Sequence, residues 1–257
     1  MSDKYEGINQ TVLESEYDGI LEEYFLTGHT AIHNFFSENI MDEARDRLLE
    51  IHKKQIQQFG EQKLRKINEE ESIRNVVEFD SFFIDLIKDE RIVKIRKDIF
   101  KQDNVLSLAN ANICTPNKKN NMLRWHRDLP YQNFICDETL GLNFFVLIDE
   151  FTVENGGTVL LPGSHKTKKL PSESFIEKHG IKTVAPKGSL IIFNSMLFHR
   201  AGQNNSTKER IGLNYNFVRP FIKQQYLNTG LDKTLFGDAY QSSENCLKLR
   251  EKFYEKN

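Results

Sequence analysis

The stretch RIGLNYNFV, residues 210–218, alternates between apolar and polar side chains. Successive side chains of a β-strand leave opposite faces of the sheet, so this stretch would present two different faces. The apolar face holds Ile211, Leu213, Tyr215 and Phe217, and the polar face holds Arg210, Gly212, Asn214 and Asn216. Such a strand is expected to separate a hydrophobic core from a polar space.

Four further strand-like runs precede this stretch, all of them after residue 104. They are VLSLANANIC (105–114), LGLNFFVLID (140–149), TVLLP (158–162) and GSLIIFN (188–194). Turn sequences rich in Gly, Pro, Asn and Lys, such as TPNKKNN and PGSHKTKK, lie between the runs. Short strands broken by such turns are typical of a β-sandwich or barrel.

The first hundred residues have a helical pattern instead. After the capping residue Ser37, apolar side chains recur at steps of three and four and predict a helix over about 38–58. These side chains are Met41, Ala44, Leu48 and Ile51. A second helical stretch is expected after a cap at Asp80, with its apolar period continuing towards residue 101. The intervening segment FGEQKLRKINEEESIRN is interpreted as a charged connector.

These patterns predict a single α+β domain over residues 1–257. Its helical part would span about 1–103 and pack on one side of an antiparallel double sheet over about 104–220. Residues 221–257 would form a C-terminal tail. The sequence gives no indication of the oligomeric state.

The composition excludes several classes of protein. A net charge of -2 gives no positive field for nucleic acid. There is no run of about 18 apolar residues, and the start MSDKYEGINQ lacks the apolar core of a secretory signal. We therefore expect a cytoplasmic protein that does not bind membranes. Three cysteines without C-x-x-C spacing argue against a disulfide framework and a structural zinc site.

A possible metal site begins in RWHRDLPY, residues 124–131, where His126 and Asp128 stand two positions apart. On a strand, both side chains would point into one space. A chain of this composition contains about one such pair by chance, so a third ligand is required. His199 is the best candidate because it closes the apolar run that begins with SLIIFN. For the other histidines a surface or packing role is expected.

Arg210 lies eleven residues after His199, on the polar face of its strand. Burying a guanidinium is costly unless a carboxylate or phosphate meets it, and the planar fork suits a carboxylate. Two interpretations remain open at this point. Either a bound ligand supplies the anion, or Arg210 pairs with an acidic residue of the protein or projects into water.

The set His126-x-Asp128, His199 and Arg210 resembles the Fe(II)/2-oxoglutarate-dependent oxygenases. DEFTVENGGTVLLPGSHK (149–166) and GHTAIHNFFSENIMDEARDRL (28–48) look like the phytanoyl-CoA dioxygenase family in particular. The resemblance covers roughly residues 20–220. It implies a double-stranded β-helix, a jelly-roll barrel with iron at one mouth and the N-terminal helices packed on one sheet.

The resemblance also implies roles for individual residues. His126, Asp128 and His199 would hold Fe(II) and leave three positions open for 2-oxoglutarate and O2. Arg210 would bind the distal carboxylate of 2-oxoglutarate, and ascorbate is a candidate stimulant. Two weaker cosubstrate contacts are Asn110 and Phe145. Many relatives carry serine or threonine where this chain has Ala201, so the second cosubstrate contact would fall to Asn214 or Thr158.

The implied function is hydroxylation of a small molecule, with succinate and CO2 as co-products. A retained Asp128 favours hydroxylation over halogenation, while desaturation and ring formation stay open. Lysines in two loops raise the hypothesis of a phosphate-bearing substrate such as a coenzyme A thioester; they are Lys118, Lys119, Lys166, Lys168 and Lys169. The alternatives are a non-catalytic jelly-roll binding or regulatory protein and a metal-dependent isomerase or hydrolase on a similar barrel.

Overall fold

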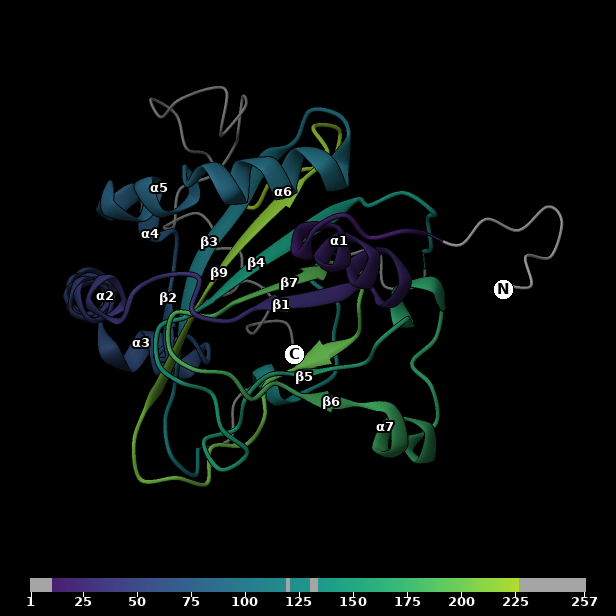
Figure 1. The fold of residues 1–257 in the computed structure, drawn as a ribbon. Helices are drawn as coiled ribbons and strands as arrows, with labels where there is room; N and C mark the ends of the chain where they lie inside the picture. Colours follow the sequence, from purple (N-terminus) through teal and green to yellow (C-terminus); the bar gives the residue numbers. More distant parts are fainter. Residues whose placement is uncertain (1–10, 119–120, 130–133, 227–257) are drawn as a thin grey trace, which may run out of the picture.

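The computed structural model describes residues 11–118, 121–129 and 134–226. Six strands form an antiparallel sheet in the order β1-β7-β4-β9-β3-β2 (Figure 1). They are β1 (His29–Ile32), β2 (Ser72–Ile73), β3 (Val105–Cys114), β4 (Gly141–Leu147), β7 (Leu190–Asn194) and β9 (Arg210–Val218). A second antiparallel sheet has the order β6-β5-β8. Its strands are β5 (Val159–Leu160), β6 (Ile181–Lys182) and β8 (His199–Arg200).

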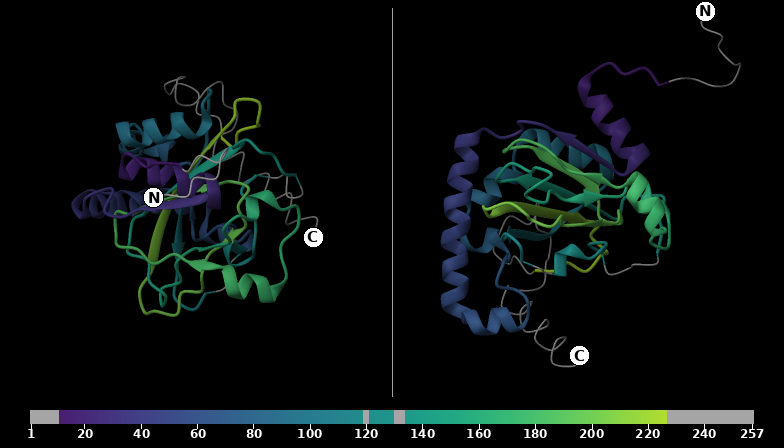
Figure 2. Two further views of the ribbon diagram at one scale, coloured as in Figure 1. Left: turned by 45° about the vertical axis from the view of Figure 1, so that its right-hand side comes forward. Right: turned by 90° about the horizontal axis from the view of Figure 1, so that it is seen from below.

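Seven α-helices accompany the two sheets in the described part of the chain. They are α1 (Glu16–Thr27), α2 (Glu38–Phe59), α3 (Glu61–Lys66), α4 (Val76–Phe79), α5 (Phe82–Ile87), α6 (Glu90–Phe100) and α7 (Glu173–His179). Figures 1 and 2 show α5 and α6 on one side of the six-stranded sheet, and β5, β6 and α7 on the other. The α+β class is thus confirmed, with helices covering one sheet. Among the described residues, no helix is both long and apolar enough to cross a membrane.

The six-stranded sheet is buried on both faces. On the helix side, Ile211, Leu213, Tyr215 and Phe217 of β9 pack with the helices in the main core, as their alternation predicted. A smaller core lies on the other face and includes Phe151 and Phe193. The polar positions of β9 point towards this second side, so the sequence pattern correctly separated core from pocket.

The helical prediction for residues 38–58 is confirmed, because α2 begins after Ser37, whose side chain accepts from the Ile40 amide. The next helix, α5, starts close to the expected cap at Asp80: the N-cap residue is Ser81, and Asp80 Oδ1 accepts from Phe82 N at 3.0 Å. The helical period beyond it is broken, however. A separate helix, α6, starts after Asp89, whose side chain accepts from the Arg91 amide.

Several short elements differ from the expectation. Helix α1 was not predicted, and the segment interpreted as a connector contains both α3 and β2. Strand β2 exists because it pairs with β3, where Ser72 lies opposite Asn112. Residues 126–128 form no regular strand, which corrects the assumption behind the H-x-D argument; His126 makes only an isolated bridge to His199.

The turn after β5 places His165 in a confined position. A Cβ atom at Gly28 would lie 2.3 Å from His165 Nδ1, so the imidazole occupies the space that this glycine leaves free. Nδ1 is buried and has no hydrogen-bond partner among the described residues. Burial, and then the nearby charges of Lys166, Arg127 and His29, lower the pKa of His165 to about 4.

This lowered pKa predicts a pH-dependent stability. The unfolded chain takes up a proton near the ordinary histidine pKa of about 6.5, before the folded protein does, so the contribution of His165 is present at neutral pH and lost as the pH falls towards 4. We expect the destabilisation caused by His165→Gln to shrink by about 1–2 kcal/mol between pH 7.5 and 4.5, after allowance for solvent screening. Denaturant unfolding of both proteins at the two pH values measures this. An unchanged difference would mean that the pKa of His165 is not lowered in the folded protein.

Candidate metal centre

The predicted ligands are brought together by a backbone bridge between two distant segments. His126 N donates to His199 O at 3.0 Å, and His199 N donates to His126 O at the same distance. Asp128 N donates to Ser195 O at 3.0 Å. Like a regular strand, this short extended pairing directs the side chains of His126 and Asp128 to the same side.

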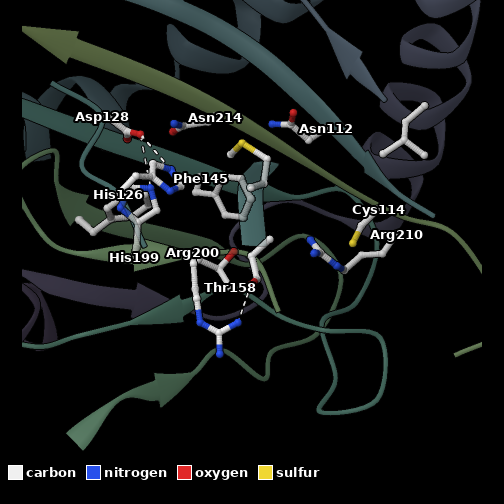
Figure 3. Close-up of a pocket in the computed structure, with 14 residues that line it drawn as sticks. Asn112, Cys114, His126, Asp128, Phe145, Thr158, His199, Arg200, Arg210 and Asn214 are labelled. Atoms are coloured by element: carbon white, nitrogen blue, oxygen red, sulfur yellow. Dashed lines mark hydrogen bonds and ion pairs between the residues drawn. The ribbon is translucent and has the colours of Figure 1, made fainter. Parts of the chain in front are cut away.

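The three side chains converge at one point. Asp128 Oδ1 lies 3.8 Å from His126 Nε2 and 3.4 Å from His199 Nε2, and one ligand atom from each residue lies within 4.8 Å of the others (Figure 3). The distances suit three donors around a single ion. The predicted set His126, Asp128 and His199 is therefore one cluster in space.

Backbone contacts orient both imidazoles. His126 Nδ1 lies 2.8 Å from Arg124 O, and His199 Nδ1 lies 3.0 Å from Leu197 O. A carbonyl only accepts, so in both rings Nδ1 carries the proton and Nε2 presents a lone pair to the cluster. That is the tautomer a metal requires, fixed by partners outside the cluster.

The electrostatics of the cluster favour an ionised carboxylate. Burial raises the pKa of Asp128, but the two imidazoles and the amide of Asn143 outweigh this and leave the pKa below its usual range. Burial, followed by the charge of His199, lowers the pKa of His126. Burial likewise lowers the pKa of His199, yet Asp128 outweighs it and the net shift is upward.

One further observation shows that the cluster fits a cation. Asp128 Oδ2 is buried and has no hydrogen-bond partner among the described residues. A buried carboxylate oxygen that lacks a hydrogen-bond partner costs free energy unless a cation neutralises the carboxylate. Two imidazole nitrogens and one carboxylate form the donor set of non-haem Fe(II) sites.

Arg210 lies in the same pocket as the cluster. Its side chain is only 4% exposed, and its guanidinium stacks over the Phe151 ring at 4.0 Å. Nε donates to Asn155 O at 3.2 Å and Nη2 to Gly156 O at 2.9 Å. Burial lowers its pKa, but a guanidinium stays charged in proteins. No ion pair to a described carboxylate balances this charge, which argues against the interpretation that Arg210 pairs with an acid of the protein.

Phe145 and Thr158, which the resemblance implied as cosubstrate contacts, also line the pocket. A Cβ at Gly212 would lie 2.5 Å from Phe145 Cζ, so the ring covers the glycine of the polar face. Ala201, at the position where the resemblance implied a hydroxyl, lines the pocket as well. Figure 3 shows the Cys114 thiol beside Arg210, a neighbour that the sequence had not suggested.

The prediction for Asn110 is not supported by its position. Its Oδ1 accepts from Asn75 N at 2.9 Å, and it does not line the pocket. Asn112, two residues further along the same face of β3, does line it, together with Asn214. The alternation of β3 could have pointed to Asn112 and Cys114, since both share the face of Asn110.

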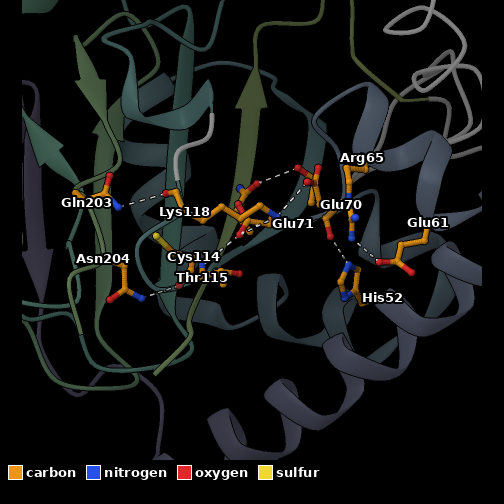
Figure 4. A network of polar contacts seen from close by, with 12 residues as sticks. His52, Glu61, Arg65, Glu70, Glu71, Cys114, Thr115, Lys118, Gln203 and Asn204 are labelled. Atoms are coloured by element: carbon orange, nitrogen blue, oxygen red, sulfur yellow. Dashed lines mark hydrogen bonds and ion pairs between the residues drawn. The ribbon is translucent and has the colours of Figure 1, made fainter. Parts of the chain in front are cut away.

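The described lysines of the two loops do not line the pocket. Lys118 Nζ lies 3.0 Å from Glu70 Oε1 and 3.6 Å from Glu71 Oε1. Figure 4 shows the Lys118 side chain directed towards these two glutamates. Lys166, Lys168 and Lys169 are exposed and do not line the pocket, and Lys119 lies outside the described residues. The four described lysines therefore give no support to the coenzyme A hypothesis.

Comparisons with known proteins agree with this geometry. The model of the phytanoyl-CoA dioxygenase (PhyH) family matches residues 24–212. An uncharacterised protein of Mycobacterium tuberculosis is 26% identical over 224 residues, which cover 84% of this chain and 79% of that protein. A Stutzerimonas stutzeri protein, named a probable alpha-ketoglutarate-dependent hypophosphite dioxygenase, is 23% identical over 214 residues and 73% of each chain.

A solved structure shows the same fold. The crystal structure of EctD from S. alaskensis with 2-oxoglutarate and 5-hydroxyectoine has a TM-score of 0.68 at 16% identity, and the match covers 89% of this chain and 86% of that one. The double-stranded β-helix expectation is confirmed by this likeness. The family match includes all three ligands of the cluster and Arg210. The chain belongs to the phytanoyl-CoA dioxygenase (PhyH) family and is an Fe(II)- and 2-oxoglutarate-dependent dioxygenase.

Proposed function

We propose that this dioxygenase hydroxylates a small molecule at the cluster formed by His126, Asp128 and His199, with succinate and CO2 as co-products. The observation that carries the proposal is the shared pocket. The three ligands lie in it together with Arg210, a buried cation without a carboxylate partner among the described residues.

Each side chain would have a distinct task. The two imidazoles and the Asp128 carboxylate would hold Fe(II). Bound Fe(II) and 2-oxoglutarate would together activate O2, so that one oxygen atom enters succinate and the other is inserted into a C–H bond of the substrate. Arg210 would bind the distal carboxylate of 2-oxoglutarate through the fork that its backbone contacts hold in place. Phe145 and Phe193 line the pocket that contains the cluster and Arg210, and they would exclude water from it.

The second cosubstrate contact falls to Thr158 in this proposal. Thr158 lines the pocket and carries a hydroxyl that can donate to a carboxylate, which Ala201 cannot do. Asn214 is less suitable, because its Nδ2 donates to Asn143 Oδ1 at 3.0 Å and its buried Oδ1 is only an acceptor. Asn112 takes the place of Asn110 as the amide on β3 that faces the pocket.

Two measurements test the proposal without a known substrate. The anaerobic Fe(II) protein is expected to bind 2-oxoglutarate, seen by calorimetry and by a change in visible absorption. On admission of O2 in the presence of ascorbate, it is expected to release succinate slowly. His199→Ala should fail in both, because it removes one metal ligand. Protein that binds Fe(II) but neither binds 2-oxoglutarate nor forms succinate would instead be the non-catalytic jelly-roll protein.

A further inference from the structure

The turn after β5 contains a buried serine close to the metal cluster. Ser164 is 2% exposed and opens a short 3₁₀ helix, η2 (Ser164–Lys166). Gly163, directly before it, has a φ of 74°, a left-handed conformation that glycine adopts at little cost and that allows this tight turn. Ser164 itself does not line the pocket. A polar residue buried this deeply requires hydrogen-bond partners within the protein.

Both oxygen atoms of Ser164 accept hydrogen bonds from the segments that carry the metal ligands. Its Oγ accepts from Phe198 N at 2.8 Å. Its carbonyl oxygen accepts from Arg127 Nη2 at 2.9 Å. Arg127 stands between the first two ligands of the cluster in the sequence, and Phe198 directly precedes the third. One residue of the turn is therefore bonded to a sequence neighbour of every ligand in the cluster.

The two residues that Ser164 holds also contact each other. The Arg127 guanidinium lies over the Phe198 ring at 3.9 Å, and both residues are at most 6% exposed. Nη2 of Arg127 donates to Thr167 O as well, directly after η2. Leu161 N, just before the turn, donates to Phe198 O at 3.0 Å. The turn thus binds both ligand-bearing segments through several contacts, and the guanidinium packs between them.

These contacts lie on the side of the ligand segments that faces away from the pocket. Successive side chains of an extended backbone alternate in direction. Arg127 and Phe198 do not line the pocket, whereas their ligand neighbours all do. With these two residues held from behind, the adjoining ligand side chains are directed into the pocket. Phe198 N has no other hydrogen-bond partner among the described residues, so the Ser164 hydroxyl is the group that satisfies it.

We propose that Ser164 is a positioning residue of the metal centre, which sets the spacing and direction of the three ligands by holding their neighbours from behind. The paired backbone bonds between His126 and His199 join the two segments directly, and Ser164 adds a fixed point beside that bridge. This inference rests on the metal site of the proposed function. Groups that orient metal ligands without touching the ion typically account for roughly 10–100-fold in metal affinity.

The test measures Co²⁺ binding to the metal-free protein by calorimetry and records the visible spectrum of the protein saturated with Co²⁺. Ser164→Ala removes the hydroxyl that holds Phe198 N. We expect the Kd for Co²⁺ to rise roughly tenfold, since the carbonyl contact to Arg127 stays, and the cobalt absorption bands to shift, because the ligands meet the ion at altered angles. A mere loss of stability would lower the unfolding temperature without moving the bands of the saturated protein.

Ser107→Ala is the matched control. Ser107 on β3 is 5% exposed, and its hydroxyl likewise accepts from a backbone amide, Gln225 N at 3.2 Å, but it does not line the pocket. The Kd for Co²⁺ and the cobalt bands of this variant should equal those of the unchanged protein. Unchanged affinity and bands in Ser164→Ala would overturn the proposal. Equal changes in both variants would do so too, because they would assign the effect to a general loss of packing.

Two further variants make every outcome interpretable. Should Ser164→Ala fail to fold, Arg127→Met makes the same comparison, since its thioether chain still covers the Phe198 ring but cannot donate to Ser164 O. Unshifted cobalt bands in that variant would overturn the proposal as well. Asp128→Ala separates the two levels, because it removes a ligand itself. If it binds Co²⁺ normally, the metal site of the proposed function fails, whereas weakened binding confines a negative result to Ser164.

Discussion

Asp128→Ala is expected to lose on the order of 100-fold or more in affinity for Fe(II), and with it all succinate formation. Asp128 is the one carboxylate of the three-residue cluster, and its lowered pKa keeps it ionised at neutral pH. Its removal leaves two neutral imidazoles, which hold a divalent ion without charge compensation. Calorimetric titration of the anaerobic apoprotein with Fe(II) and a succinate assay measure the two losses.

Asp80→Ala is a suitable control for this prediction. It also removes a carboxylate with a lowered pKa, but one that accepts from the Phe82 amide of α5 and pairs with Arg47 at 2.8 Å, away from the cluster. Its Fe(II) affinity should equal that of the unchanged protein. If Asp128→Ala bound Fe(II) as tightly as this control, the cluster would not be the metal centre.

Arg210→Met is expected to raise the Kd for 2-oxoglutarate on the order of 100-fold, while leaving the Fe(II) affinity unchanged. Losing one partner of a buried, hydrogen-bonded charge pair costs about 2–5 kcal/mol, and each 1.4 kcal/mol is about tenfold in affinity. The thioether fills the space over Phe151 but carries no charge. Anaerobic calorimetry with the Fe(II) protein gives both affinities directly.

Arg200→Met provides the comparison for Arg210. Arg200 is an arginine of the same pocket, but its guanidinium lies over Trp125 at 5.3 Å, and Figure 3 shows its side chain leading away from Arg210. We expect 2-oxoglutarate to bind this variant normally. Undiminished binding to Arg210→Met would remove the role proposed for Arg210 and would favour the isomerase or hydrolase alternative, which needs no cosubstrate arginine.

The sequence predicted the elements that carry a long periodic pattern. Strand β9 matches its predicted range because the two faces of residues 210–218 differ so clearly in polarity. Helix α2 likewise follows its apolar stripe. The short elements were missed since they have little pattern of their own. Strand β2 consists of two residues and owes its existence to its partner β3.

The site could be predicted to a similar degree. The spacing of His126 and Asp128 occurs about once by chance, so these residues and His199 were assigned as a ligand set only through the resemblance to the oxygenase family. The role of Arg210 was likewise implied by that resemblance, since its position on a strand left two interpretations open. Choosing between Asn110 and Asn112 was harder, since both lie on one face of β3. The choice depends on Asn75, a residue from a distant segment, whose backbone amide donates a hydrogen bond to the Asn110 side chain.

Strand β9 serves the core with one set of residues and the pocket with the other. A single inserted or deleted residue within it would exchange the two sets, burying the guanidinium among phenylalanines and presenting isoleucine and leucine to the reactants. Relatives can therefore diversify at the even-numbered positions by substitution alone, and length variation has to be confined to the loops at either end.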